Sequence, residues 1–393
     1  MPTFSFWPTI ITIACVLAVI LTICAYEILA ERKISAWVQD RIGPNRVGPR
    51  GLLQPIADGL KFLLKEDIIP DHVDKVLFVL APAIALSTAL FAFAVVPFGP
   101  TSVPGEPGYS PDNYQFVIAP GLSIGIVFVF AVGSLNVYGV ILGGWASNNK
   151  YSLLGALRSS AQLVSYEIPM GMSILGVVLM SSSLNLEQII AAQAHQGLFG
   201  WHVWYQPLAF LLFLTSVFAE TNRLPFDLAE AEQELVGGYH TEYSAMKFAM
   251  FFLGEYAHMI TTSFLLVILF FGGWHFPWLS DVSGLAGIIL KLIIFWLKMV
   301  AFIVFYMLVR WTIPRFRFDQ LMALAWKVMI PLALVNLLCV MILKQCTAPS
   351  WVVALVSWLV LFGSAVVVAS WPQETRRARL ARLDGERLEM AAR

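Results

Sequence analysis

The sequence predicts an all-α, polytopic integral membrane protein. Of its 393 residues, 59% are hydrophobic and only 13% are charged, which leaves too little polar surface for a soluble globule. Apolar runs recur along the chain, and a run of about 20 apolar residues is long enough to cross a bilayer as a helix. The net charge is zero, so the chain lacks the basic excess that nucleic-acid-binding proteins show.

Nine apolar runs predict nine transmembrane helices, at residues 8–30, 76–97, 116–142, 157–180, 206–222, 246–272, 285–309, 327–346 and 351–371. The first run lacks the basic start and the small-residue cleavage site of a signal peptide, so we expect it to be a retained span. Residues 1–371 would then form one membrane domain, and residues 372–393 would form a tail.

The basic residues predict the orientation. Of the 25 Lys and Arg residues, 22 fall in segments that would share one side of the membrane, namely 31–75, 143–158, 223–247, 310–327 and the tail. Because short basic loops stay in the cytoplasm, the N-terminus should be periplasmic and the C-terminus cytoplasmic. The cytoplasmic loops 31–75 and 223–245 carry most of the polar residues that could have a function.

The first cytoplasmic loop predicts an interfacial helix. Gly43 to Pro49 is rich in turn-forming residues and precedes an amphipathic stretch. Its apolar residues recur at helical spacing opposite polar ones: Leu53, Ile56, Leu60 and Leu64 against Gln54, Asp58, Lys61 and Lys65. Lying in the headgroup plane, this helix could frame a side entrance for a lipid-soluble ligand, or it could only anchor the loop.

The segment from Ala219 to Tyr243 is the most acidic part of the chain. It holds six carboxylates between two apolar stretches, and in a helix Asp227, Glu230 and Glu234 would share one face while Glu232 points elsewhere. Like charges at this spacing repel unless water, basic partners or raised proton affinities relieve them. The pattern is therefore consistent either with a proton-handling site or with a solvated loop.

Charged residues inside the predicted spans also need a reason. Glu167 and Glu255 lie about 15 Å from the cytoplasmic helix ends, near mid-membrane, where a bare carboxylate is costly. Lys298 is at a similar depth, so an ion pair with one of the glutamates is one interpretation and proton relay is the other. Tyr166 and Tyr256 adjoin the two glutamates, and His258 follows Glu255 by three residues.

Metal and nucleotide chemistry find no support in the sequence. The four cysteines lie far apart without a CxxC spacing, and no two of the six histidines have metal-ligand spacing. No GxGxxG or Walker motif occurs. We therefore expect no redox cofactor, metal or nucleotide to be bound by this chain alone.

Four segments resemble the quinone-site membrane subunit of respiratory complex I, the proton-translocating NADH:quinone oxidoreductase. They contain the strings RIGPNRVGP near Arg41, GWASN near Gly144, ETNRLPFDL from Glu220 and RWTIPRFRFDQLM from Arg310, and together they span most of the chain. The resemblance implies a subunit that shapes a chamber for ubiquinone or menaquinone, with electrons arriving through partner subunits. The partner subunits would be the quinone-site and terminal iron-sulfur subunits of the peripheral arm. Small membrane subunits would lie beside this chain in the bilayer.

The resemblance also assigns residues to two roles. The quinone chamber mouth would be formed by Glu31, Arg32, Arg41, Asp58 and Lys65. A polar path for protons into the membrane would use Glu167, Glu220, Asp227, Glu230, Glu232, Glu234, Glu242 and Glu255.

Two other functions fit part of the pattern. The related membrane subunit of an energy-converting hydrogenase shares the acidic loop but need not bind quinone, and the GPNRVGP loop argues against it. A secondary cation transporter would also place acids and a lysine at mid-membrane, but it should show internal repeats, which are absent here. The ninth run resembles the extra helix of several bacterial members, whereas mitochondrial members typically stop near the eighth span, and this resemblance implies a bacterial inner membrane.

Overall fold

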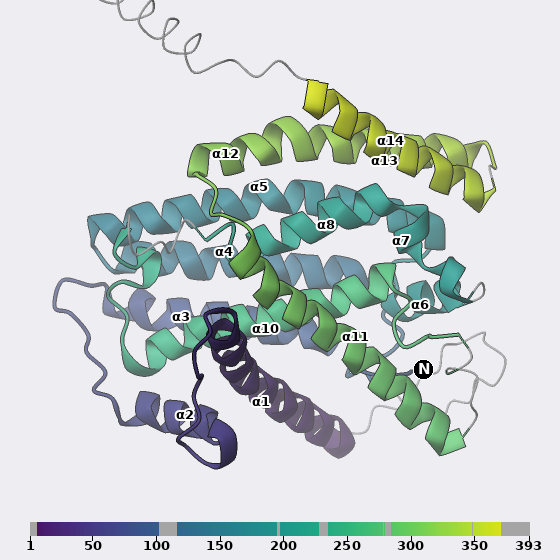
Figure 1. Ribbon diagram of the computed structural model, residues 1–393. Coiled ribbons are helices and arrows are strands. Elements are labelled where there is room, and N and C mark those ends of the chain that lie inside the picture. Colours follow the sequence, from purple (N-terminus) through teal and green to yellow (C-terminus); the bar gives the residue numbers. More distant parts are fainter. Residues whose placement is uncertain are drawn as a thin grey trace, which may run out of the picture.

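The computed structural model describes residues 6–101, 116–194, 197–227, 235–277, 279, 284–347 and 349–370, and every regular element in these ranges is a helix. The longest are α1 (Phe6–Val38), α3 (Lys75–Phe91), α4 (Gly125–Ala146), α5 (Lys150–Ser181), α10 (Ala245–Phe270), α11 (Gly284–Thr312), α13 (Ile330–Gln345) and α14 (Ser350–Ser370). Most of them run side by side along one axis, whereas α1 and α11 cross the bundle obliquely (Figure 1).

Seven helices in the described ranges are long and apolar enough to cross a membrane, and they coincide with seven of the nine predicted runs. The two remaining runs become shorter apolar stretches of helix. These are α8 (Pro207–Glu220) and residues Ser350–Val366 of α14. The run predicted from residue 116 begins as a helix only at Gly125, because Pro120 and Gly121 form a turn in which Gly121 has a φ of +71°.

Helix α10 forms the centre of the bundle. Every residue from Tyr256 to Phe270 is buried, and the helix packs against α1, α3 and α11. The outer helices instead expose large apolar side chains, such as Leu285 and Leu297 on α11 and Trp351 on α14. A helix that is apolar all round and enclosed by others is typical of the core of a membrane bundle.

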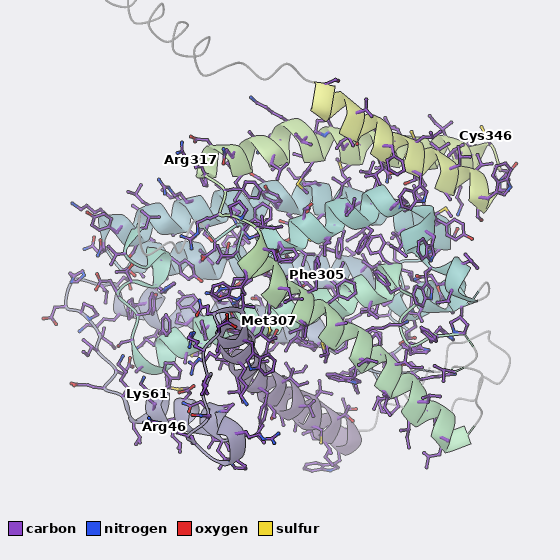
Figure 2. The ribbon with its side chains drawn as sticks, viewed as in Figure 1. Arg46, Lys61, Phe305, Met307, Arg317 and Cys346 are labelled. Carbon is purple, nitrogen blue, oxygen red and sulfur yellow. The ribbon has the colours of Figure 1, made fainter. Side chains whose placement is uncertain are left out.

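Residues predicted on opposite sides of the membrane lie toward opposite ends of the bundle. Figure 2 shows Arg46, Lys61 and Arg317, all from predicted cytoplasmic segments, toward one end of the molecule, and Cys346 toward the other. The labelled residues of segments 31–75 and 310–327 therefore lie toward the same end of the bundle (Figure 2).

The helix predicted in the first loop is α2 (Gln54–Leu64). It follows a tight loop in which Gly51 has a φ of +80°, and a Cβ there would lie 2.1 Å from the Pro44 carbonyl oxygen, so only glycine fits. The side chains of Ile56, Leu60 and Leu64 are exposed. This leaves one apolar face of α2 without protein cover, as expected of a helix that lies on a lipid surface.

An extra residue enters the helical turn between α12 (Phe318–Ala323) and α13. Residues Leu324–Met329 form a π-helix directly before Pro331, whose missing N–H and bulky ring disturb the preceding turn. Trp326 in this turn donates its indole N–H to Ser165 Oγ on α5 (3.2 Å), and Tyr166 donates to the Leu321 carbonyl (2.9 Å). Tyr166, which adjoins Glu167 in the sequence, therefore uses its hydroxyl to tie α5 to α12.

Candidate functional site

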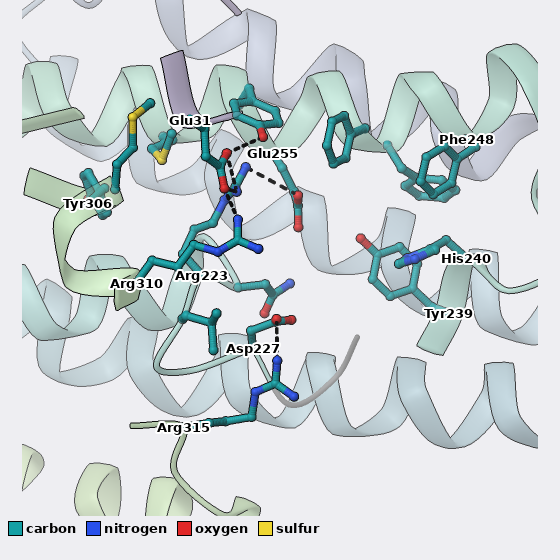
Figure 3. Close-up of a pocket in the computed structure, with 17 residues that line it drawn as sticks. Glu31, Arg223, Asp227, Tyr239, His240, Phe248, Glu255, Tyr306, Arg310 and Arg315 are labelled. Carbon is teal, nitrogen blue, oxygen red and sulfur yellow. Dashed lines mark hydrogen bonds and ion pairs between the residues drawn. The ribbon is translucent and has the colours of Figure 1, made fainter. Parts of the chain in front are cut away.

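A cavity of about 480 Å³ opens between α1, α10, α11 and the segment that follows α8. Charged groups gather at one end of it, and aromatic groups at the other, where Figure 3 shows Tyr239, His240 and Phe248. The charged groups come from four separate parts of the chain: Glu31, Arg223, Asp227, Glu255, Arg310 and Arg315. A cavity with charged and aromatic ends can hold an amphipathic ligand.

Glu31 is the hub of the charged end. Its carboxylate accepts hydrogen bonds from Arg223 (3.2 and 3.3 Å) and from the Tyr256 hydroxyl (2.5 Å), and it also pairs with Arg310. The side chain is only 9% exposed. Because charge-assisted bonds to both of its oxygens replace water, Glu31 can stay ionised in this buried position.

Arg223 connects Glu31 to Glu255. One terminal nitrogen lies 3.9 Å from a Glu255 oxygen, and the guanidinium sits 4.3 Å from the Tyr256 ring centre. Burial works against the Arg223 charge, but Tyr256, Glu31 and Glu255 outweigh burial and raise the pKa of the guanidinium well above its usual range. Arg223 is therefore a fixed positive charge shared by two carboxylates.

Asp227 forms a second pair with Arg315 at the edge of the cavity, with 3.3 Å between Nη2 and Oδ2. Burial raises the pKa of the Asp227 carboxyl, and repulsion from Glu255 raises it further, while Arg315 opposes the change; the resulting pKa is about 6. This carboxyl can change its charge near physiological pH, unlike an ordinary aspartate.

Polar groups continue from Glu255 into the bundle. Glu255 also lines a small adjoining cavity with Glu220 and His258, and a third small cavity again includes Glu220 and His258. Glu220 Oε1 lies 3.1 Å from His258 Nε2. The series of cavities therefore leads from the charged chamber to the Glu220 and His258 pair.

Glu167 lies beside this series on the α4 side. It accepts a hydrogen bond from Ser134. The preceding residue, Gly133, faces the Glu220 and His258 pair, since a Cβ there would lie 3.5 Å from Glu220 Oε1. Helix α4 thus separates Glu167 from Glu220 by one pair of small residues.

The structure places the other predicted residues apart from the main cavity. Arg32 pairs with Asp58 (2.6 Å), Arg41 is exposed and bonds to Gln39, and Lys65 is exposed after the end of α2. Glu242 accepts from Asn149 (2.7 Å) beyond the aromatic end. Glu230, Glu232 and Glu234 lie outside the described residues.

A separate cavity, of about 230 Å³, is almost wholly apolar and lies between α1, α2 and α10. It includes Ile28, Phe62 and Leu63 together with Asp58. Phe252 lines both this cavity and the charged one. Phe252 therefore lies between the apolar space behind α2 and the charged chamber.

The interpretation of Lys298 as the partner of a mid-membrane glutamate was wrong. Its ammonium donates to the carbonyls of Phe271, Gly273 and His275 at 2.8 to 2.9 Å, and it lies 4.5 Å from the centre of the Trp201 ring. These groups follow the C-terminal end of α10, away from Glu255. The oblique path of α11 carries Lys298 to that end, which depth counted along a straight span could not show.

Sequence reasoning missed three arginines and one acid of the site. Arg223, Arg310 and Arg315 were counted only for topology, although buried carboxylates at this density require cations nearby. Glu27 was overlooked inside the first apolar run, where it is 4% exposed. The signal was present in both cases, since a charge within or next to a span needs a partner or a proton.

The comparisons with known proteins identify the family. A family profile described as NADH dehydrogenase matches residues 11–341. A Koribacter versatilis protein, named as an H subunit of NADH-quinone oxidoreductase, is 49% identical over 342 residues, which cover 84% of this chain and 94% of that relative. The chain belongs to the H-subunit family of NADH-quinone oxidoreductase. The H subunits of Flavobacterium psychrophilum and Geobacter metallireducens are 48% and 50% identical over 84% and 83% of the chain, and over 94% and 93% of their own lengths.

Family membership makes this chain a multi-pass membrane subunit of complex I, which works together with the other subunits of that enzyme. Within the described residues, no group of three or more His, Cys, Asp or Glu side chains is arranged to hold a metal ion. The main cavity is lined by carboxylates, arginines and aromatic groups.

Proposed function

We propose that this chain forms the membrane part of a quinone chamber and couples quinone reduction to proton translocation. The observation that carries the proposal is the position of Glu255, which lines both the charged cavity and the small cavities that lead to Glu220 and His258. A charge change in the chamber is therefore felt by a carboxylate that also faces the bundle interior.

The quinone would enter from the lipid behind α2. The apolar cavity between α1, α2 and α10 suits the tail of ubiquinone or menaquinone, and the charged cavity beyond Phe252 suits the headgroup. Electrons would come from the peripheral-arm quinone-site and terminal iron-sulfur subunits, because this chain is proposed to bind no redox cofactor itself. Small membrane subunits would cover its remaining apolar faces.

Protons would move along the carboxylates that the cavities connect. Glu255, Glu220 and Glu167 form the part of this path that lies in the bundle, and Asp227 lies at its chamber end. Glu230, Glu232, Glu234 and Glu242 would extend the path toward the cytoplasmic loop. We place the protein in a bacterial inner membrane with nine spans, a periplasmic N-terminus and a cytoplasmic C-terminus.

The relatives favour this function over the two alternatives. The proteins of Koribacter, Flavobacterium and Geobacter are all named for NADH-quinone oxidoreductase, which favours a quinone-linked subunit over one from an energy-converting hydrogenase or a secondary cation transporter. Purification tests the choice directly. The chain should be isolated with iron-sulfur and other membrane subunits and should support quinone-dependent NADH oxidation, whereas a transporter would be isolated alone.

Replacing Asp58 with alanine should weaken quinone use more than electron input. Asp58 holds Arg32 at 2.6 Å and lines the apolar cavity, so its loss loosens α2 from α1 where the tail would pass. We expect the KM for quinone to rise several-fold while reduction of an artificial acceptor upstream of quinone is unchanged. Lys61→Ala, on the exposed face of the same helix, is the control. A parallel loss of both activities in assembled complex would contradict the assignment.

Replacing Asp227 with asparagine should have an effect that depends on pH. The pKa of this carboxyl is raised to about 6, so the wild type carries the charge at pH 8 and loses it as the pH falls through 6. The ratio of variant to wild-type quinone reduction should therefore be near one at about pH 5 and fall several-fold at about pH 8. Measuring both enzymes across this range tests the charge, and a constant ratio would exclude it.

A further inference from the structure

Glu27 on α1 is a buried acid without a partner. It is 4% exposed, and neither carboxyl oxygen has a hydrogen-bond partner among the residues that the structure describes. An ionised carboxylate that is buried without a hydrogen-bond donor is strongly unfavourable. Glu27 therefore holds its proton in this arrangement of the chain.

The neighbours of Glu27 belong to the charged cavity. Glu31 lies one turn further along α1 on the same face, about 6 Å along the axis. Arg223 and Tyr306 both interact electrostatically with Glu27. The titratable and charged groups that face this pair of acids from α1, α10, α11 and the segment after α8 are Cys24, Tyr256, Tyr306, Arg310 and Arg223.

The two acids of α1 are in opposite states of pairing. Glu31 has Arg223, Arg310 and Tyr256, whereas Glu27 has no donor in the part of the chain that the structure describes, although it interacts electrostatically with the same Arg223. If Glu31 took up a proton, Arg223 would lose its closest anion. The carboxyl one turn earlier on the same helix could then ionise, because an unpaired cation nearby favours the charged form of an acid.

We propose that Glu27 and Glu31 share one exchangeable proton. Glu27 holds it while the arginines bind ionised Glu31, and the proton passes to Glu31 when that carboxylate is released from them. The O–H bond at Glu27 breaks and an O–H bond forms at Glu31. The negative charge thereby moves one turn back along α1, from Glu31 to Glu27, where Arg223 stabilises it. No oxidant or reductant takes part. This inference rests on the proposed function, since the change in charge that releases Glu31 would come from quinone chemistry in the chamber.

Glu27→Gln in the whole membrane complex tests the shared proton. Glutamine keeps the shape and neutrality of the resting side chain, so assembly should be normal. Without the internal donor, Glu31 must take its proton from the bulk solvent. Protons in the solvent become scarcer as the pH rises. The alkaline limb of quinone-dependent NADH oxidation should therefore move toward acid by about one pH unit, the low end of the shift that a neighbouring charge causes. Glu27→Asp, which keeps an ionisable proton, should retain most of the wild-type profile.

Infrared difference spectra of the complex, recorded as the quinone is reduced, give a second readout. The wild type should show loss of a protonated-carboxyl C=O band that is missing in Glu27→Gln. Glu187→Gln is the matched control, because Glu187 is also a buried acid at 4% exposure but lies on α6 (Leu186–Ala194), away from the chamber. It should keep both the band and the pH profile.

The outcomes separate this inference from the proposed function. A Glu27→Gln complex with a wild-type pH profile and an unchanged carboxyl band would overturn the shared proton, even if Glu255→Gln abolished coupling. If Glu27→Gln reduced the amount of complex, the infrared band of the remaining complex and the Glu27→Asp profile would still decide. A wild-type profile in Glu255→Gln together with a shifted one in Glu27→Gln would instead contradict the proposed path.

Discussion

Glu255→Gln is expected to assemble normally and to lose most quinone reduction together with proton pumping. Glutamine keeps the shape of the side chain but cannot release a proton, and Glu255 is the carboxylate that lines both the chamber and the inner cavities. We expect a loss of at least about tenfold, which is modest beside the ~10²- to 10⁴-fold that a positioned proton-transfer group contributes. Its contact with Arg223 is long, at 3.9 Å, so the fold should tolerate the change.

The measurement needs three quantities from the same membranes: the amount of complex, quinone-dependent NADH oxidation and the membrane potential. Glu187→Gln again serves as the control for loss of a buried carboxyl far from the chamber. Full abundance with wild-type turnover and pumping would remove Glu255 from the path. Because Lys298 bonds to backbone carbonyls elsewhere, its neutralisation should not rescue any defect of Glu255→Gln.

Glu31→Gln should instead reduce the amount of assembled complex. Glu31 is the common anion of Arg223 and Arg310, and removing one partner of a buried ion pair typically costs about 3 to 5 kcal/mol. We expect a value near the lower end, because the Arg310 side chain is 39% exposed and water can take over part of its solvation. The contrast with Glu255→Gln follows from the distance to the shared Arg223, which lies 3.2 Å from Glu31 and 3.9 Å from Glu255.

A double variant separates charge from shape. Glu31→Gln combined with Arg310→Met removes one cation along with the anion, so the abundance and thermal stability of the complex should recover in part. Arg310→Met alone should be less damaging than Glu31→Gln, since Glu31 would keep Arg223 and Tyr256. Normal abundance of the Glu31→Gln complex would show that the ion pairs do not hold α1 and α11 together.

Much of the helical layout follows from the order of residues along the chain. Apolar length and turn chemistry predict the long helices and α2, and family resemblance predicts which acids matter. The run at 206–222 gives a helix of only 14 residues, because Pro207 starts it and the chain turns after Glu220. Local sequence says where an apolar run lies, but the surrounding bundle decides how much of it is helical.

The sequence predicted some of the acids of the site, but neither Glu27 nor the arginines that pair with them. Glu31 was expected at the mouth of the chamber, yet it lies between Arg223 and Arg310, which are far away in sequence. Those contacts arise because α1 and α11 both run obliquely across the bundle beside α10, and no local pattern encodes the packing of two oblique helices (Figure 1). The arginines were explained by the positive charge of cytoplasmic loops, so their second role as partners of buried acids was not predicted.

The carbonyl cage around Lys298 gives α10 a fixed end. The Lys298 ammonium donates to three backbone carbonyls after Phe270 and lies against the Trp201 ring. These contacts connect the C-terminal end of α10 to α11. Glu255 lies fifteen residues before Phe270, near the middle of the helix. The half of α10 that follows Glu255 is therefore enclosed by other helices along its length and anchored to α11 at its end, so a change in charge at Glu255 acts on a helix whose far end is held.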